Sequence, residues 1–491
     1  MELYNLLQSI NNNIISISEA ILLDKKAVEL NNIPQIILME EAAEKIVYNL
    51  KKDFTYLQNE NIAIISGWGN NGGDVLSVAR KLFVDGINCD IYIFEDKKSS
   101  TLNETHKNIL ISFGIKLLNI NKLKNNINKY SVILDGIFGI GYKYREDKII
   151  ENLFLLINKS NAKIVAIDVP SGLNTDSYPS VEADYTYSIG YLKDYLFLLN
   201  TRKKAGIIRD IKISFNINNI KLENSFYYSD KVFPIKKNKN NFVHKYSRGS
   251  CLCIGGSPGK FGSIVFTSES ALNTGCGISC VITENDNVIP INSMSKKIIV
   301  DSFDKIDLYL KKYNSVVIGP GLNFLNIKNK RYIEDLIKLK KKFILDASFF
   351  TLFKKEILYN FTYPPILTPH SQEFKTFFND ESLQLNSNTL KTVSDLSKKY
   401  RCYILLKESF IVYSDPNGKI TVFDNPQRIL AQAGSGDILT GIIGGLLSQG
   451  YETENVILES IRIFYKIADE FNKNEYNSYS PDVFIDMISK Y

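Results

Sequence analysis

The chain has 491 residues, of which 44% are hydrophobic and 23% are charged, a composition typical of globular proteins. This length allows two or three domains, each with its own core. A formal net charge of +6 is small for such a length, so no nucleic-acid partner is predicted. No uninterrupted apolar run could span a bilayer and residues 1–13 do not resemble a secretory signal, so we expect no membrane partner.

The six cysteines are not spaced as a disulfide framework. Cys251 and Cys253 are expected to point the same way on a strand, and Cys276 and Cys280 to share a helix face. These four thiols could hold a metal ion, but we favour buried, reduced thiols. Because disulfides persist in oxidising compartments, the cysteine pattern predicts a cytoplasmic location.

The N-terminal half begins with helical patterns and continues with the pattern of a parallel sheet. Helices are predicted across residues 18–58. The apolar run Ile62–Ile65 then predicts a buried strand, Gly67–Asp74 a turn, Val75–Val84 a helix and Asp90–Phe94 a second strand. A strand, a helix and a strand in this order form the βαβ unit of parallel sheets.

Two more predicted strands of this half end in acidic residues. They are Val132–Asp135 and Ile164–Asp168, followed by Gly136–Gly141 and Val169–Gly172. In doubly wound sheets the ligand lies beyond the carboxyl ends of the strands. The side chains expected to meet there are Asn70, Asn71, Asp74, Asp135 and Asp168.

The turn after the first strand also matches the dinucleotide fingerprint Gly67-x-Gly69-x-x-Gly72. Glu95, at the end of the next predicted strand, could bind a ribose. A nicotinamide-dependent dehydrogenase is therefore an open alternative. The paired asparagines and Gly73-Asp74 are not needed by that fingerprint, and they add amide oxygens and a carboxylate to the loop.

Residues 210–240 are rich in Asn and Lys and lose the α/β pattern, so we place a domain boundary near residue 225. The predicted domains are 1–225 and 226–491. A second α/β pattern follows, with strands at Ser250–Ile254, Val316–Ile318, Phe343–Asp346, Pro365–Leu367 and Tyr403–Lys407. Both halves are thus predicted to be α/β.

The run Ala433–Gly441 places two closely spaced glycines before an acidic residue. Gly434 and Gly436 allow a tight turn, and the apolar residues after Asp437 recur at helical spacing as far as Gly450. The free N–H groups at such a helix start bind anions, so Asp437 is a candidate base beside a phosphate-sized pocket. The alternative is a core helix with a stabilising acidic residue in its first turn.

Two of the three histidines have a predicted place. His106 is expected on the surface of a helix. His370 follows Thr368-Pro369 at a predicted strand end, and we expect it to face a ligand.

Two sets of motifs resemble known families. The first set is Asn70-Asn71-Gly72-Gly73-Asp74, Asp135-Gly136-Ile137-Phe138-Gly139-Ile140-Gly141 and Asp168-Val169-Pro170-Ser171-Gly172-Leu173. With it, residues 20–220 resemble the NAD(P)H-hydrate epimerase domain. The second set is His244-Lys245, Gly319-Pro320-Gly321-Leu322, Thr368-Pro369-His370 with Glu373, and Gly434-Ser435-Gly436-Asp437. With it, residues 240–470 resemble the ribokinase-like ADP/ATP-dependent NAD(P)H-hydrate dehydratase.

The fused order is similar to that of the bifunctional bacterial nicotinamide-nucleotide repair enzymes. The resemblance implies an N-terminal Rossmann-like doubly wound domain and a C-terminal ribokinase-like α/β domain. It implies a first domain that epimerises the R and S hydrates of NADH and NADPH, with Asp168 as the proton-transfer residue. The second domain would dehydrate the S form at the expense of ADP or ATP, with Asp437 as the base.

The resemblance also implies the binding residues. The hydrate would contact Asn70, Asn71, Gly72, Gly73, Asp74, Gly139, Ile140, Gly141, Tyr142, Lys143, Tyr144, Arg145 and Asp168 in the first domain, and Gly321, His370 and Asp437 in the second. The adenine nucleotide would contact Lys407, Glu408, Ser409, Phe410 and Gly436, with magnesium expected beside it. A potassium ion would bind Asn71, Asp135 and Ser171. A homo-oligomer is expected.

Several positions depart from the family pattern. Val75 replaces a usual glycine, Asn323 follows Gly-Pro-Gly-Leu, Ser371 and Gln372 replace Pro-Gly, and Glu408 replaces the glycine after Lys407. Two other functions remain open. One is a small-alcohol kinase of ribokinase type, and the other keeps the N-terminal half as a non-catalytic nucleotide- or protein-binding module.

Overall fold

The structure is a computed structural model of the chain. It describes residues 12–143, 146–173, 179–214, 226–228, 244–310, 312–323, 327–474, 476 and 478–491. The described part forms two compact units. The N-terminal unit contains residues 12–226 and 386–389, and the C-terminal unit contains residues 227–385 and 390–491.

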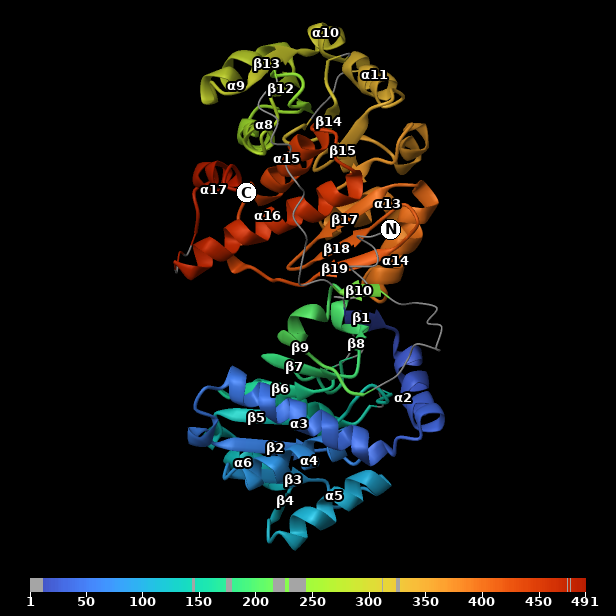
Figure 1. The fold of residues 1–491 in the computed structure, drawn as a ribbon, viewed down its shortest axis with the longest axis vertical. Coiled ribbons are helices and arrows are strands. Elements are labelled where there is room, and N and C mark those ends of the chain that lie inside the picture. The colour runs from blue at the N-terminus through green and yellow to red at the C-terminus, as the bar shows by residue number, and fades with distance from the viewer. Residues whose placement is uncertain are drawn as a thin grey trace. The chain divides into compact units, whose positions relative to one another are not determined.

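The N-terminal unit contains a seven-stranded, fully parallel sheet in the order β4-β3-β2-β5-β6-β7-β9 (Figure 1). The order reverses between β2 and β5, so their carboxyl ends form the switch point of a doubly wound sheet. This confirms the predicted fold class. The strands are β2 (Ile62–Ser66), β3 (Cys89–Ile93), β4 (Leu117–Asn119), β5 (Val132–Gly136), β6 (Lys163–Ile167), β7 (Tyr185–Ile189) and β9 (Ile207–Ile211).

Helices cover both faces of this sheet because successive side chains of a strand point to opposite sides. Helices α3, α4 and α5 bury one face, where Ile64 of β2 lies, and α6 and α7 bury the other, where Ile65 lies. The helices are α2 (Ile17–Asn31), α3 (Gln35–Asp53), α4 (Asn70–Val84), α5 (Thr101–Ser112), α6 (Leu123–Asn126) and α7 (Lys148–Asn158). A short parallel pair, β1 (Asn12–Ile15) with β8 (Leu192–Lys193), completes this unit.

Helix α4 begins at Asn70 rather than at Val75, so the predicted turn over Gly67–Asp74 is too long. The first turns of the helix tolerate glycine because the backbone here is closely packed. A Cβ on Gly72 would lie 2.1 Å from the carbonyl oxygen of Gly67. Only glycine allows that approach, and a pattern read from apolar spacing alone cannot place this helix start.

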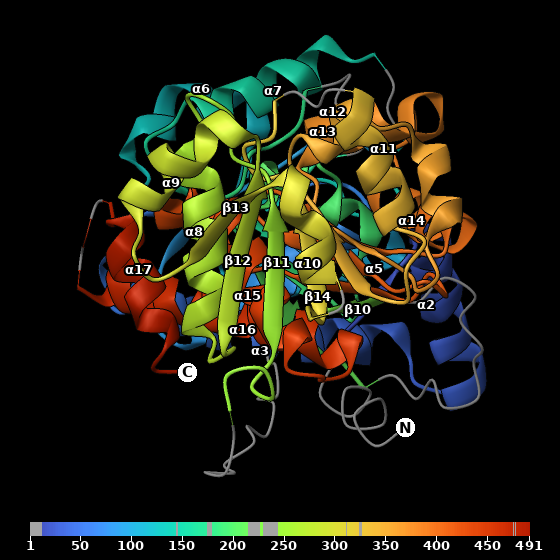
Figure 2. The ribbon, with the colours of Figure 1, turned by 90° about the horizontal axis from the view of Figure 1, so that it is seen from above.

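The C-terminal unit contains a mixed sheet in the order β13-β12-β11-β14-β15-β16-β17-β18-β19. Strands β11 to β17 are parallel to one another, and β17, β18 and β19 form an antiparallel meander. Figure 2 shows β12, β11 and β14 side by side. The strands are β11 (Ser250–Ile254), β12 (Ile278–Thr283), β13 (Ile299–Ser302), β14 (Ser315–Ile318), β15 (Lys342–Leu345), β16 (Ile366–Leu367), β17 (Tyr403–Lys407), β18 (Ile411–Ser414) and β19 (Ile420–Phe423), with β10 (Phe226–Tyr228) parallel to β19.

Helix α15 crosses the centre of the C-terminal unit and packs closely on α8. A Cβ on Gly441 would lie 2.2 Å from the carbonyl oxygen of Thr267, and one on Gly445 would lie 2.3 Å from that of Ala271. The helices of this unit are α8 (Phe261–Asn273), α9 (Val288–Met294), α10 (Ile306–Leu310), α11 (Ile327–Leu336), α12 (Phe349–Leu352), α13 (Ser371–Phe378), α14 (Thr389–Tyr400), α15 (Ser435–Ser448), α16 (Thr453–Lys473) and α17 (Pro481–Ile488). No described helix is long and apolar enough to cross a membrane.

Two predictions about single side chains are wrong. Cys280 lies in strand β12, not on a helix with Cys276. Helix α8 ends at Asn273, and Gly275 (φ +98°) turns the chain before β12 begins. His106 is 1% exposed in α5 rather than at the surface, with its Nδ1 atom 3.8 Å from Glu40 Oε1. The prediction of buried, reduced thiols is confirmed for Cys251, Cys253, Cys276 and Cys280.

Candidate active sites in the two units

The N-terminal unit has a cleft of about 800 Å³ beyond the carboxyl ends of β2, β5 and β6. Nine of the residues predicted to bind the hydrate line it, namely Asn70, Asn71, Asp74, Gly139, Ile140, Gly141, Tyr142, Lys143 and Asp168. Gly72 and Gly73 are buried in the first turns of α4 and do not line the cleft. Tyr144 and Arg145 lie outside the described residues.

Asp168 lies directly after β6 with a left-handed backbone conformation (φ +70°), which is uncommon for a residue other than glycine. Its backbone N–H donates to the Tyr187 carbonyl at 2.8 Å. Its Oδ1 atom accepts hydrogen bonds from Ile189 N–H at 3.2 Å and from Lys193 Nζ at 2.5 Å. These contacts fix the carboxylate at the wall of the cleft. Such a strained backbone is a feature of functional sites.

A second carboxyl, that of Asp74, lies in the same wall. Desolvation raises the pKa of Asp74 well above its usual value, and the charges of Asp168 and Asp24 raise it further. Lys193 acts in the opposite direction. Asp74 is therefore suited to donate a hydrogen bond or a proton, while Asp168, beside an ammonium group, is suited to accept one.

The residues predicted to bind potassium lie behind this wall. Asp135 is fully buried, and burial raises its pKa to about 6. Its Oδ1 atom accepts from Ser171 Oγ at 2.6 Å and its Oδ2 atom from Ser171 N–H at 2.8 Å. The side-chain amide of Asn71 is buried, and neither its oxygen nor its nitrogen has a hydrogen-bond partner among the described residues. A buried amide oxygen without a partner, a carboxylate and a hydroxyl are oxygen donors of the kind that a hard cation binds.

An aromatic wall faces the same cleft. The rings of Phe138 and Tyr142 are stacked with centroids 4.1 Å apart, and Trp68 meets Phe138 edge-on at 5.0 Å. Lys97 lies over the Trp68 ring at 5.5 Å. Stacked rings beside an ammonium group suit a planar, negatively charged ligand such as a nucleotide.

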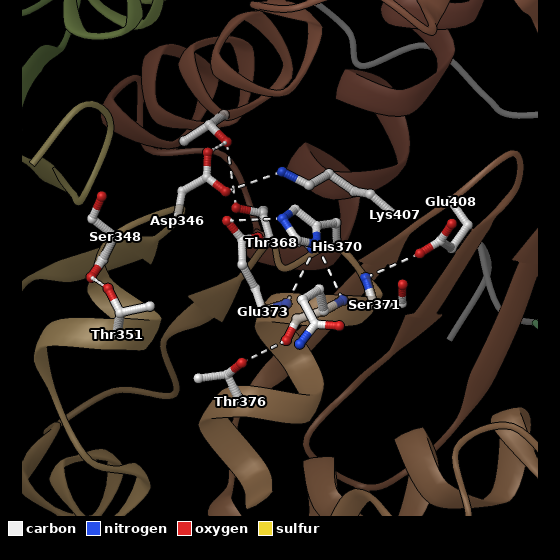
Figure 3. Close-up of polar contacts among 12 residues, drawn as sticks. Asp346, Ser348, Thr351, Thr368, His370, Ser371, Glu373, Thr376, Lys407 and Glu408 are labelled. Atoms are coloured by element: carbon white, nitrogen blue, oxygen red, sulfur yellow. Dashed lines mark hydrogen bonds and ion pairs between the residues drawn. The ribbon is translucent and has the colours of Figure 1, made fainter. Parts of the chain in front are cut away.

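In the C-terminal unit, polar side chains gather where β15, β16 and β17 end (Figure 3). Asp346, which follows β15, accepts hydrogen bonds from Lys407 Nζ at 3.0 Å and from Thr440 Oγ1 at 2.7 Å. Thr368 follows β16, and its Oγ1 atom lies 3.3 Å from Thr440 Oγ1. Asp346 is 2% exposed, so its charge is neutralised by Lys407 rather than by water.

Helix α15 begins beside this network, as predicted from its glycines. Gly434 adopts a left-handed conformation (φ +94°) at the N-cap, and Asp437 lies in the first turn. A Cβ on Gly436 would lie 3.2 Å from Lys407 Nζ, so the ammonium group flanks the helix start. Burial and then the charge of Asp346 raise the pKa of Asp437 to about 6. A carboxyl of this kind can exchange a proton near neutral pH.

His370 forms the cap of helix α13. Its Nδ1 atom accepts from the N–H groups of Gln372 and Glu373, at 3.1 and 3.3 Å. Its Nε2 atom lies 3.4 Å from Glu373 Oε1, and its side chain is 54% exposed (Figure 3). The imidazole is thus held in one orientation while part of it stays open to a ligand. Desolvation, and then the charge of Asp346, raise the pKa of Glu373.

The remaining predicted residues of this site lie on two loops. Gly321 (φ +65°) sits after β14, where a Cβ would lie 2.4 Å from the Lys260 carbonyl oxygen. Ser409 is exposed and Phe410 is buried after β17. Glu408 Oε1 accepts from the N–H of Ser371 at 3.0 Å. The departures at Ser371 and Glu408 therefore compensate each other, since a proline has no N–H to donate.

Three residues of these sites were not predicted. Asp346 was recognised only as an acidic strand end, and nothing in the sequence pairs it with Thr440. Lys193 lies in a two-residue strand, too short for any periodic signal. In each case the role depends on contacts between segments far apart in the chain.

The chain matches two family models, "NAD(P)H-hydrate dehydratase" over residues 251–490 and "YjeF-related protein N-terminus" over residues 35–195. It is 31% identical over 454 residues to the bifunctional NAD(P)H-hydrate repair enzyme Nnr of Dictyoglomus turgidum, covering 87% of this chain and 88% of the relative. The chain belongs to the family of bifunctional NAD(P)H-hydrate repair enzymes. The members from Moorella thermoacetica and Escherichia coli are both 26% identical, covering 87% and 79% of this chain and 86% and 76% of their own.

A solved structure of the ADP/ATP-dependent NAD(P)H-hydrate dehydratase from Bacillus subtilis, co-crystallised with ATP and Mg²⁺, is also similar. It is 21% identical and covers 53% of this chain and 93% of its own length, with a TM-score of 0.45.

Proposed function

We propose that this repair enzyme epimerises the R and S hydrates of NADH and NADPH in its N-terminal unit and dehydrates the S hydrate in its C-terminal unit, using ADP or ATP. One observation carries the proposal. Each unit holds an acidic residue beside a lysine. Asp168 follows strand β6 and binds Lys193, and Asp437 lies in the first turn of α15, whose start is flanked by Lys407.

In the N-terminal unit, inversion at the hydrated carbon requires a bond to that carbon to break and re-form, and a proton to move. Asp168 would take and return that proton, since its carboxylate is fixed at the cleft wall by Lys193 and Ile189. Asp74, whose pKa is raised by desolvation, would donate a hydrogen bond to the hydroxyl. The aromatic wall would hold a planar ring of the substrate.

Asn71, Asp135 and Ser171 would hold the potassium ion. Its charge would stabilise negative groups of the substrate near the carboxyl edge of the sheet. The unpaired amide of Asn71 supports this assignment, because a buried amide without a partner is costly.

In the C-terminal unit, Asp437 would accept the proton of the hydrate's hydroxyl while a phosphoryl group is transferred to its oxygen. The first N–H groups of α15 and the Lys407 ammonium would stabilise the negative charge of that group. Loss of phosphate from this carbon and of a proton from the adjacent carbon then restores the double bond of the reduced nicotinamide. Gly436 and the segment from Lys407 to Phe410 would bind the nucleotide, accompanied by magnesium, and Gly321 and His370 would contact the hydrate.

We also propose a cytoplasmic location, which the free cysteines support. The predicted homo-oligomer stays a prediction.

The test is to incubate the purified protein with mixed hydrate epimers, with ADP, with ATP or without nucleotide. The proposal is supported if the absorbance of reduced nicotinamide recovers only in the samples that contain nucleotide. A stable phosphorylated hydrate without this recovery would instead identify a small-alcohol kinase. No reaction in any arm would refute both.

A further inference from the structure

Lys193 is the most deeply buried cation among the described residues that line the N-terminal cleft. It lies at the end of β8, lines the cleft, and is 3% exposed. Its Nζ atom donates to Asp168 Oδ1 at 2.5 Å, to the Ile189 carbonyl at 2.6 Å and to Ser188 Oγ at 3.4 Å. An ammonium group has three N–H donors, so all of them are used within the protein.

This geometry leaves Lys193 no N–H for a substrate. It therefore acts through Asp168 rather than on the ligand. Oδ1 of Asp168 is occupied by two donors, whereas no described residue donates to Oδ2. Oδ2 lies 3.3 Å from where a Cβ on Gly139 would stand, next to the side chain of Asn71. The free oxygen therefore faces the Gly139 loop, which lines the cleft.

The charges around Lys193 come from several elements. Asp168 follows β6, Asp24 lies on α2, Asp74 on α4 and Asp210 on β9. Burial raises the pKa of the last three, and the Lys193 charge counteracts that rise. Tyr195, in the turn after β8, faces Asp168. Lys212 also faces Asp210. Without Lys193, Asp168 would stand among carboxyl groups with no ammonium group to hold its Oδ1 atom.

We propose that Lys193 is the positioning residue of epimerisation: it holds Oδ1 of Asp168, so that Oδ2 is turned to the cleft and receives the proton of the hydrate's hydroxyl. The inference rests on the proposed function of the N-terminal unit. It explains why a lysine is kept out of water at this point, where its burial costs free energy that only the ion pair offsets.

The experiment compares Lys193→Met and Lys193→Arg with the parent and with Lys163→Met, all in the full chain. Lys163 also pairs with an aspartate, Asp184, at 2.8 Å, but it lies at the opposite end of β6 and its side chain is 63% exposed. Epimerisation is followed without nucleotide, so that dehydration does not consume the product. Each variant is measured for kcat and KM, and by thermal unfolding.

Lys193→Met is expected to lower kcat on the order of 10²-fold and to change KM little, because Lys193 has no N–H left for the substrate. Lys193→Arg should restore part of the rate, and Lys163→Met should match the parent. A merely structural lysine would change the melting temperature and the amount of active protein but not kcat per folded molecule.

If Lys193→Met keeps the parent's kcat, or if Lys193→Arg restores none of the lost rate, the inference is wrong. That outcome differs from failure of the proposed function, in which the parent itself does not interconvert the epimers. Dehydration of the S hydrate, measured in the same samples with nucleotide present, should be equal in all four proteins.

Discussion

The two candidate acid–base residues have different surroundings. Asp168 accepts a hydrogen bond from the ammonium group of Lys193. Asp437 lies near Asp346 and Glu373, and burial and these charges raise its pKa to about 6. The carboxyl of Asp437 can therefore exchange a proton near neutral pH.

Replacing Asp437 by Asn tests the base of dehydration. Asn keeps the size of the side chain but cannot take a proton, so the rate of dehydration should fall by a factor on the order of 10² to 10⁴. Nucleotide binding, measured by calorimetry, and epimerisation should stay near the parent's values. Burial raises the pKa of Asp437 to about 6, above its value in the unfolded chain, so at pH 7 the carboxylate is less favourable in the folded state than in the unfolded state. The variant should therefore not unfold earlier than the parent. A variant that dehydrates at the parent rate would remove Asp437 from the mechanism.

The charge of Asp346 should set the pH dependence of the same reaction. In Asp346→Asn the side chain can still accept the hydrogen bond from Thr440 but carries no charge. Since Asp346 raises the pKa of Asp437, its loss should lower that pKa. The acidic limb of the dehydration profile should then move to lower pH. Thr376→Val, which removes an exposed hydroxyl on α13, is the matched control, and a limb that stays in place or moves upward would contradict the assignment.

The proposed potassium site can be tested by thermal unfolding as well as by activity. Asp135→Ala removes both oxygens that Ser171 now contacts. The parent's melting temperature should rise with added potassium chloride relative to sodium chloride, because an ion that binds only the folded state stabilises it. The variant should lose that difference and epimerise more slowly. Equal responses of the two proteins to potassium would show that the ion does not bind at Asp135.

At the scale of elements, the contact between α15 and α8 depends on glycine. A methyl group on Gly441 would meet the Thr267 carbonyl oxygen at 2.2 Å, so Gly441→Ala should destabilise the C-terminal unit by about 1–3 kcal/mol. Gly262→Ala on α8 is the control, because its Cβ would have only Phe266 nearby at 3.9 Å. The stability of both variants is measured by urea unfolding, with dehydratase activity as the signal. If Gly441→Ala unfolds at the same urea concentration as the control, the close packing of the two helices is wrong.

The elements that could be predicted from the sequence are those with a strong local signal. Strands such as Ile164–Asp168 are apolar runs that end in a carboxylate, because parallel strands are buried on both faces. The Gly-Ser-Gly turn before Asp437 likewise predicts a helix start. The start of α4 could not be predicted, since glycine in a helix is tolerated there only through tertiary packing against Gly67.

The candidate sites follow the same division. Asp168 and Asp437 stand at strand and helix ends, where the chain's own pattern marks them. The partners that set their chemistry, Lys193 and Asp346, are brought to them from other segments. No spacing in the sequence encodes those distances, so their roles emerge only from the three-dimensional structure.

At the scale of the whole molecule, the two family matches cover residues 35–195 and 251–490, and the two compact units divide between Phe226 and Tyr227. The domain boundary near residue 225 stays a prediction. A chain with both activities can repair a mixed pool of hydrates, because the epimer that the dehydratase does not accept is converted into the one that it does.

The most direct measurement of this account is the extent of repair of a defined mixture of R and S hydrates with excess nucleotide. The parent should restore the whole pool to reduced nicotinamide, as read from its absorbance. Asp168→Asn should restore the S fraction at the parent rate and then stop, apart from the slow uncatalysed conversion of the R hydrate. Full restoration by Asp168→Asn at the parent rate, or a parent that stops at the S fraction, would contradict the account.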